Sequence, residues 1–328
     1  MAGTSQPPLV ATHTEPRPGT QGGHGGVPSA GRVRRLTGRD RVVVVLMLVV
    51  PLLLTIGLVW LPALATVVLS FTNWDGIGEL SDIEFVGAKN YSDVVTIYPP
   101  FWPAIQNNVL WLAVLFFVAT PFGMFLAVLI DKELRGSRFY QTTLYMPVVL
   151  SLALVGFIWQ LQYSRDQGLL NDVLLRVGLI DAPVDWYGDS SVNIWAVLVA
   201  TCWRHVGYIM LLYLAGLKGV DPSLREAASM DGAGEVKTFF RIVFPVMRPI
   251  NIIVVVITVI ESLRAFDLVW VVNNGRNGLE LISALVTSNV VGEASRIGFG
   301  SALATIMLVI SLVFIVFYLA TVMREEER

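Results

Sequence analysis

The sequence predicts an all-α protein that crosses a membrane six times. Of its 328 residues, 55% are hydrophobic and only 15% are charged, and the mean hydropathy is +0.66. Ordinary soluble domains carry about 25% charged residues, so this chain has too little polar surface to fold in water alone. Apolar segments close to the roughly 20 residues that a spanning helix needs lie at about 43–70, 108–130, 143–163, 193–217, 250–272 and 302–322.

The rest of the composition excludes several classes of protein. The formal net charge of −2 gives no basic field that would attract nucleic acid. The one cysteine, Cys202, excludes a disulfide framework within the chain and any multi-cysteine metal site. Of the three histidines, His13 and His24 lie near the N-terminus and His205 lies in an apolar segment, so no metal centre is expected.

Residues 1–41 are expected to form a disordered, basic tail, and residues 42–328 the membrane domain. The first 31 residues contain seven glycines and five prolines and too little apolar surface to offset the entropy of the chain. Arginines then cluster at positions 32, 34, 35, 39 and 41. The apolar segment that follows is longer than the core of a signal peptide and lacks a convincing cleavage site, so it is predicted to be the first spanning helix.

The later segments include prolines, and their flanking charges predict an orientation. Prolines inside spanning helices are tolerated because neighbouring helices satisfy the freed carbonyl groups. If the N-terminus is cytoplasmic, the cytoplasmic segments hold 16 Lys and Arg residues and the outer loops hold 5. Because positive residues concentrate on the cytoplasmic side, both termini are expected to face the cytoplasm.

The loop at 218–249, between the fourth and fifth segments, predicts two short helices joined by a turn. Asp221, Pro222 and Ser223 offer a cap and a first-turn proline for a helix that continues through Glu226. Asp231-Gly232 then signals a helix stop.

A second helix is expected over 235–243, with Val236, Phe239, Phe240 and Val243 on one face. Pro245 and Pro249 are expected to end it and to turn the chain back toward the bilayer. The product is an elbow at the membrane surface, suited to docking in a groove on a partner.

The same loop carries a motif. Its residues resemble the EAA loop of binding-protein-dependent ABC import permeases, in which the loop is the coupling helix that enters a cleft of the cytoplasmic ATPase. The matching positions span about 24 residues and are Glu226, Ala227, Ala228, Asp231, Gly232, Ala233, Phe239, Ile242, Pro245 and Pro249. The alternative is a well-capped surface helix pair with no partner.

Two further stretches resemble the carbohydrate-uptake permeases of the maltose type. One begins at Phe266-Asp267 and one at Phe299-Gly300, and Asn107-Asn108 resembles the start of the family core. The family's Gly-Gly-Pro turn is missing and is replaced by residues 273–277. The resemblance covers roughly residues 40–325, and the extra N-terminal helix favours the first-subunit type of a heterodimeric pair.

The resemblance implies a type I ABC importer permease fold in the cell membrane. It implies partners: a second homologous permease, two ATPase subunits and an extracytoplasmic sugar-binding protein. The residues agree that this chain is not an enzyme, because none of its lysines, Lys89, Lys132, Lys218 and Lys237, follows a glycine as a phosphate-binding loop requires. The chain is therefore expected to bind no cofactor, and ATP and magnesium are expected in the partner ATPases.

Charged residues in the fifth segment mark a candidate substrate pathway. Glu261, Arg264 and Asp267 are three residues apart, and they can form a self-neutralising ion ladder or the polar wall of a sugar pathway. By similarity to the maltose-type permeases, Tyr208, Thr258, Glu261 and Ser262 align with pocket positions. Arg204 is expected to pair with another side chain, and His205 to be a hydrogen-bonded core histidine.

The sequence is compatible with two other functions. Glu261 or Asp267 could serve as the proton-relay carboxylate of a secondary transporter driven by an ion gradient. A membrane scaffold that transports nothing is the third possibility.

Overall fold

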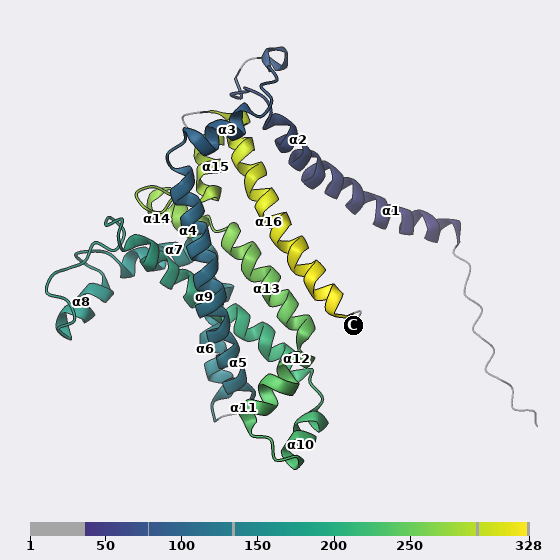
Figure 1. Ribbon diagram of the computed structural model, residues 1–328, viewed down its shortest axis with the longest axis vertical. Helices are drawn as coiled ribbons and strands as arrows, with labels where there is room; N and C mark the ends of the chain where they lie inside the picture. Colours follow the sequence, from purple (N-terminus) through teal and green to yellow (C-terminus); the bar gives the residue numbers. More distant parts are fainter. Residues whose placement is uncertain (1–36, 78, 133–134, 293–294, 327–328) are drawn as a thin grey trace, which may run out of the picture. The chain divides into compact units, whose positions relative to one another are not determined.

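The computed structural model describes residues 37–326, apart from residues 78, 133–134 and 293–294 (Figure 1). Most of the predicted tail, residues 1–36, lies outside the described residues. Helix α1, Gly38–Thr55, begins four residues before the expected boundary at residue 42, so Arg39 and Arg41 belong to its first turn. The Thr37 amide donates to the Asp40 carboxylate at 3.0 Å, which fixes that start.

The chain divides into two compact units, one ending at Ile56 and one beginning at Gly57. The first unit contains α1, in which no residue is buried. A largely apolar helix that buries none of its residues against the described part of its unit is suited to contact with lipid or with another chain.

The second unit is built from helices. In the described part of the chain the one β-bridge is an isolated pair, Thr72 with Phe85. The helices are α2 Leu61–Leu69, α3 Lys89–Thr96, α4 Phe101–Val114, α5 Thr120–Asp131, α6 Ser137–Val149, α7 Leu152–Gln162, α8 Leu169–Arg176, α9 Asn193–Lys218, α10 Pro222–Met230, α11 Glu235–Thr238, α12 Phe244–Val246, α13 Arg248–Leu263, α14 Asp267–Asn273, α15 Ile282–Val290 and α16 Ile297–Glu326.

Within the described residues, four helical stretches are long and apolar enough to cross a membrane, and two bent helix pairs raise the number to six if each pair is one span. The four are Gly38–Leu69, Phe101–Asp131, Asn193–Lys218 and Ile297–Thr321. These match the predicted first, second, fourth and sixth segments. The other two segments fall on the bent pairs.

The predicted third span is not a single helix. It is α6 followed by α7, with a bend of 103° between them. Leu150 leaves the helix with an extended backbone, and Ser151 caps α7 by accepting a hydrogen bond from the Leu154 amide at 3.2 Å. The fifth span, α13 with α14, follows the helix Glu235–Val246 at a bend of 78°.

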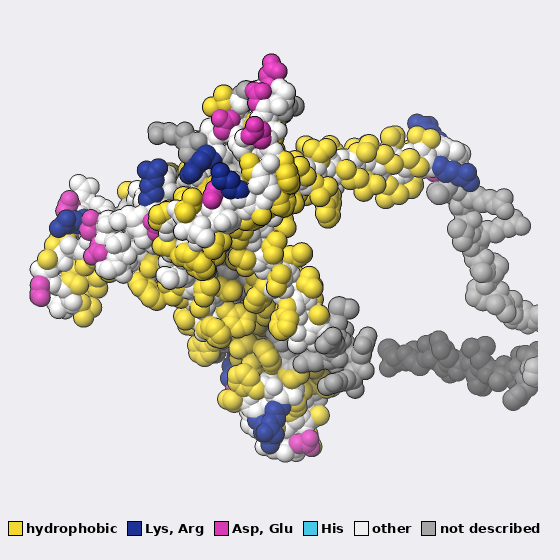
Figure 2. All heavy atoms as spheres, turned by 45° about the horizontal axis from the view of Figure 1, so that its top comes forward, with side chains coloured by type: hydrophobic (Ala, Val, Ile, Leu, Met, Phe, Trp, Pro, Cys, Tyr) yellow, Lys and Arg dark blue, Asp and Glu magenta, His cyan; other side chains and the backbone are white. Residues whose placement is uncertain are grey.

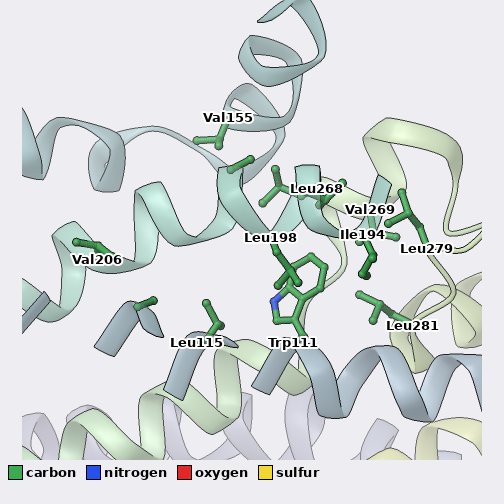
Figure 3. Packing of buried hydrophobic residues seen from close by; sticks show 13 residues of the cluster. Trp111, Leu115, Val155, Ile194, Leu198, Val206, Leu268, Val269, Leu279 and Leu281 are labelled. Atoms are coloured by element: carbon green, nitrogen blue, oxygen red, sulfur yellow. The ribbon is translucent and has the colours of Figure 1, made fainter. Parts of the chain in front are cut away.

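Helix α9 lies at the centre of the second unit. It packs along α5 and α6 and also meets α13. One buried cluster joins it to α4 and α14 through Trp111, Leu198 and Leu268 (Figure 3). A second cluster joins Ile209 and Met210 of α9 to α5 and to the end of the loop at Val243.

The helices α10, α11 and α12 lie at one end of this unit, and α3 and α15 lie at the other (Figure 1). Figure 2 shows hydrophobic side chains covering the helices between these ends and charged side chains gathered beyond them. An apolar band between two charged zones is the arrangement expected of a protein that spans a bilayer.

Candidate functional site

The loop at 218–249 forms the predicted elbow. Asp221 caps α10 by accepting a hydrogen bond from the Ser223 amide at 2.9 Å, and Pro222 is the first residue of the helix. This hydrogen bond holds the pKa of the Asp221 carboxyl below its usual value of 3.8. The predicted cap and first-turn proline are both confirmed.

The elbow turns at Gly232, in the left-handed conformation with φ +72°. The Ala233 amide donates to the Ala228 carbonyl at 2.9 Å, and the Gly232 amide donates to the Ser229 carbonyl at 3.0 Å. These two bonds are the Schellman termination of a helix. Glycine takes this backbone conformation without the strain that a side chain adds.

The second helix of the elbow is longer than predicted. Helix α11 runs into a π-helical turn at Phe239–Val243 and then into α12, so the chain stays helical past Pro245. The helix ends at Val246, one residue after Pro245, and the chain turns at Met247, just before α13. The expected end of this helix at Pro245 and Pro249 is therefore confirmed.

The motif residues differ in exposure. Ala228 is buried and Ala233 and Phe239 are half-buried, which holds the elbow together. Glu226, Ala227, Asp231 and Pro245 are exposed. The most exposed large apolar side chains of the elbow are Met230 at 88%, Val236 at 73% and Phe240 at 57%. Exposed apolar groups gathered on one loop are typical of a surface suited to docking.

Charged side chains connect the elbow to the end of α5. Arg225 lies 2.8 Å and Lys218 lies 3.4 Å from the carboxylate of Asp131, whose side chain is 10% exposed. Beside them Lys132 pairs with Glu235, and this hydrogen bond lowers the pKa of the Glu235 carboxyl.

An apolar groove of about 610 Å³ lies between the elbow and α5. The four residues predicted to share a face, Val236, Phe239, Phe240 and Val243, all line it. Its other walls include Met124, Phe125 and Val128 of α5, and the charged pairs stand at its edge. The elbow therefore contacts α5 through incomplete apolar packing supplemented by ion pairs.

The second candidate region is a small polar pocket between α4, α9 and the break between α13 and α14. It brings together Arg204, Glu261, Arg264 and Asp267. Its volume is about 30 Å³, enough for only a few water molecules. In this conformation the pocket cannot hold a sugar.

The ion ladder, one of the two alternatives that the spacing left open, is not found among the described residues. Helix α13 ends at Leu263 and α14 begins at Asp267, so the three charges do not share one continuous helix. Glu261 instead pairs with Arg204 of α9, with 3.7 Å between the charged atoms, which confirms that Arg204 has a partner. The Nε atom of Arg204 is buried without a hydrogen bond among the described residues.

The remaining pathway candidates do not line this pocket. Thr258 and Ser262 are fully buried. The Thr258 hydroxyl lies 3.3 Å from both Nε2 of His205 and the Thr120 hydroxyl, so His205 is the expected hydrogen-bonded core residue. Tyr208 is half-buried against the cluster around Ile209. Of the five predicted pathway residues, the structure brings only Glu261 and Asp267 into one pocket.

Sequence reasoning missed the charges that join α5 to the elbow. The charged residues themselves stand out in the sequence, because Arg225 immediately precedes Glu226 of the motif and Asp131-Lys132 closes an apolar segment. Their pairing does not. Pairing across about 90 positions is a tertiary contact that no local pattern encodes.

The chain matches a family model over residues 41–325, described as "Binding-protein-dependent transport system inner membrane component". Two curated relatives are similar over most of their length. The probable ABC transporter permease YurN of Bacillus subtilis is 32% identical, covering 80% of this chain and 90% of the relative. The xylose/arabinose import permease XacH of Haloferax volcanii is 31% identical, covering 74% of this chain and 76% of the relative.

Two solved structures share the fold. A bacterial ABC transporter involved in the import of the acidic polysaccharide alginate superposes with a TM-score of 0.75 at 20% identity, covering 87% of this chain and 96% of that chain. A complex of the bacterial alginate transporter with a periplasmic protein that binds an alginate pentasaccharide gives a TM-score of 0.73 at 20% identity, covering 85% of this chain and 93% of that chain.

Proposed function

The chain belongs to the family of binding-protein-dependent transport system inner membrane components, and from this premise we propose that it forms one half of the sugar pathway of an ATP-driven importer. It is a multi-pass membrane permease of the ABC importer type, as its sequence resemblance implied, and it is not an enzyme. The observation that carries the proposal is the elbow at Gly232, which exposes Met230 and Val236 at one end of the membrane unit.

The proposed substrate is a sugar or oligosaccharide. The relative XacH is named for import of xylose and arabinose, and one solved relative is described as an importer of alginate. The polar pocket offers the groups that a polyhydroxylated substrate needs, since Arg204 and Arg264 donate hydrogen bonds and Glu261 and Asp267 accept them. Because the pocket volume of about 30 Å³ is enough for only a few water molecules, it must widen before a sugar enters.

The proposed partners are a second homologous permease, two ATPase subunits and an extracytoplasmic sugar-binding protein. One solved relative is in complex with a periplasmic protein that holds an oligosaccharide, which supports the last of these. ATP and magnesium are assigned to the ATPases. The excess of Lys and Arg in the loops on one side supports an orientation with both termini in the cytoplasm.

The proposed mechanism is alternating access. Closure of the ATPases on ATP displaces residues 226–249 of the elbow, and the displacement turns the pathway from inward-facing to outward-facing. The elbow can drive this change only if it binds the two ATPase states with different affinity, because an equal affinity moves no equilibrium.

The Gly232→Val substitution tests this role. Valine at φ +72° is strained by about 1–2 kcal/mol, so the elbow loses its shape while the apolar helices stay intact. The complete importer in proteoliposomes should keep hydrolysing ATP but import little sugar. Gly234→Val is the matched control, because Gly234 has a negative φ of −68° and open space around it. Normal uptake by Gly232→Val would falsify the coupling role.

Two other measurements address the two other functions. The comparisons give no support to a secondary transporter driven by an ion gradient. Uptake by the isolated chain under such a gradient would nevertheless overturn the proposal. A scaffold predicts that substitutions at Glu261 or Asp267 leave uptake unchanged.

A further inference from the structure

We infer that Asp131 is a positioning residue that links the motion of the elbow to α5 and α9. The inference rests on the proposed coupling role of the elbow. It assigns a function to a residue outside the motif and outside the polar pocket.

The position of Asp131 is unfavourable within its own helix. It is the last residue of α5, and a negative charge at the C-terminal end of a helix meets the negative end of the helix dipole. Its side chain is also only 10% exposed. A carboxylate so placed is stable only with cationic partners supplied by other elements.

Two elements supply those partners. Arg225 of α10 donates to one carboxylate oxygen at 2.8 Å, and Lys218, the last residue of α9, approaches the other oxygen at 3.4 Å. One carboxylate therefore joins α5, α9 and α10. Arg225 directly precedes Glu226, so this junction adjoins the motif that faces the ATPase.

The apolar contact between α10 and α5 is weak by comparison. The groove of about 610 Å³ separates the elbow from Phe125 and Val128 of α5. Helix α10 packs mainly on α11 and on the π-helical turn at Phe239–Val243. A displacement of α10 thus reaches α5 through the Asp131 ion pairs, and reaches the core separately through Val243.

A neighbouring pair provides a matched control. Lys132 and Glu235 cross the same groove edge, but their side chains are 47% and 83% exposed. Exposed ion pairs contribute little because water and salt screen them. Loss of this pair should have little effect on coupling, whereas loss of the Asp131 pairs should have a large one.

The test compares Asp131→Asn with Lys132→Gln in the complete importer. The measurements are the amount of ATPase that co-purifies, the rate of ATP hydrolysis, and sugar uptake per ATP hydrolysed. The sugar is the one that the cognate binding protein binds in a panel. Asp131→Asn should lower uptake per ATP by at least about fivefold, the lower end of typical coupling between sites, while Lys132→Gln changes it by less than about twofold.

A second variant keeps the result decisive if Asp131→Asn fails to assemble. Arg225→Gln removes the α10 partner but leaves Lys218 beside the carboxylate, and it should also lower uptake per ATP, whereas Arg225→Lys should retain most of it. A purely structural role would reduce assembly and leave the ratio unchanged in the complexes that form. The inference is overturned if assembled Asp131→Asn, or Arg225→Gln in its place, keeps the wild-type ratio. If the wild-type importer itself does not couple uptake to ATP, the proposed function fails instead.

Discussion

The elbow and the polar pocket are both polar regions of one membrane unit, but they are stabilised in different ways. The elbow is specified by residues close together in the sequence: a cap at Asp221, a left-handed glycine at Gly232 and a proline at position 222. The pocket is specified by residues far apart, since Arg204 and Glu261 come from different helices. The shape of the elbow is therefore encoded locally, whereas the pocket between helices depends on packing.

The strongest way to sharpen this comparison is to disturb helix packing near the pocket. A Cβ atom at Gly207 of α9 would lie 2.3 Å from the Leu144 carbonyl oxygen of α6. Gly207→Ala should therefore destabilise the protein by about 1–3 kcal/mol, the usual penalty of overpacking. The measurement is the thermal unfolding midpoint in detergent.

The control for that variant lies in the elbow. Gly234→Ala places a Cβ in open space and should leave the midpoint nearly unchanged. Equal midpoints for Gly207→Ala and the wild type would show that α6 and α9 do not approach as closely as the structure indicates.

A smaller effect is expected from the Arg204–Glu261 pair. Arg204→Met leaves the Glu261 carboxylate without its partner, whereas Arg204→Met with Glu261→Gln removes both charges. Removing one partner of a partly buried ion pair lowers the free energy of unfolding more than removing both partners. Because the two side chains are 23% and 40% exposed, solvent screening should limit the difference between the two losses to about 1 kcal/mol. Unfolding of the two single variants and the double variant forms the cycle that measures it, and additive effects would contradict the pairing.

The smallest effect concerns the cap of α10. The pKa of Asp221 is lowered in the folded protein by the hydrogen bonds from Ser223. The cap therefore contributes stability that is fully present above the ordinary pKa of 3.8 and is lost as the pH falls through the lower folded value. The protection of the Ser223 amide, measured as its exchange rate relative to the intrinsic rate at each pH, should fall only in that acidic range.

The Asp221→Asn variant is the matched control for the cap. Asparagine also caps helices but has no carboxyl to titrate, so its amide exchange should show no such step. A step of the same size in both proteins would assign the acid sensitivity to another group.

The comparison also explains how much the sequence predicts. The all-α class, the six apolar segments, the start of α10 and its end before Gly232 follow from composition and local signals, and the structure agrees with them. The bend at Leu150–Ser151 was missed because an apolar run with a proline does not reveal where a helix breaks. The continuation of the helix past Val243 was missed because a π-helical turn carries no sequence signature.

The contacts of the pocket could not be derived from sequence. Spacing suggested a ladder of Glu261, Arg264 and Asp267, but the helix ends at Leu263 and Glu261 pairs with α9 instead. The ion pairs of Asp131 with Arg225 and Lys218 were missed for the same reason. Ion pairs between helices depend on how the helices are placed relative to one another. That placement is set by the packing of many side chains together, and it cannot be derived from individual residues.

The most direct test of the coupling role is a photo-crosslinker placed at Met230, which is 88% exposed at the end of α10. In the complete importer it should form an adduct with the ATPase subunit, while the same group at Phe317, 74% exposed in the apolar helix α16, should not. An importer that carries its ATPases but gives no adduct from Met230, Val236 or Phe240 would contradict the coupling role of the elbow.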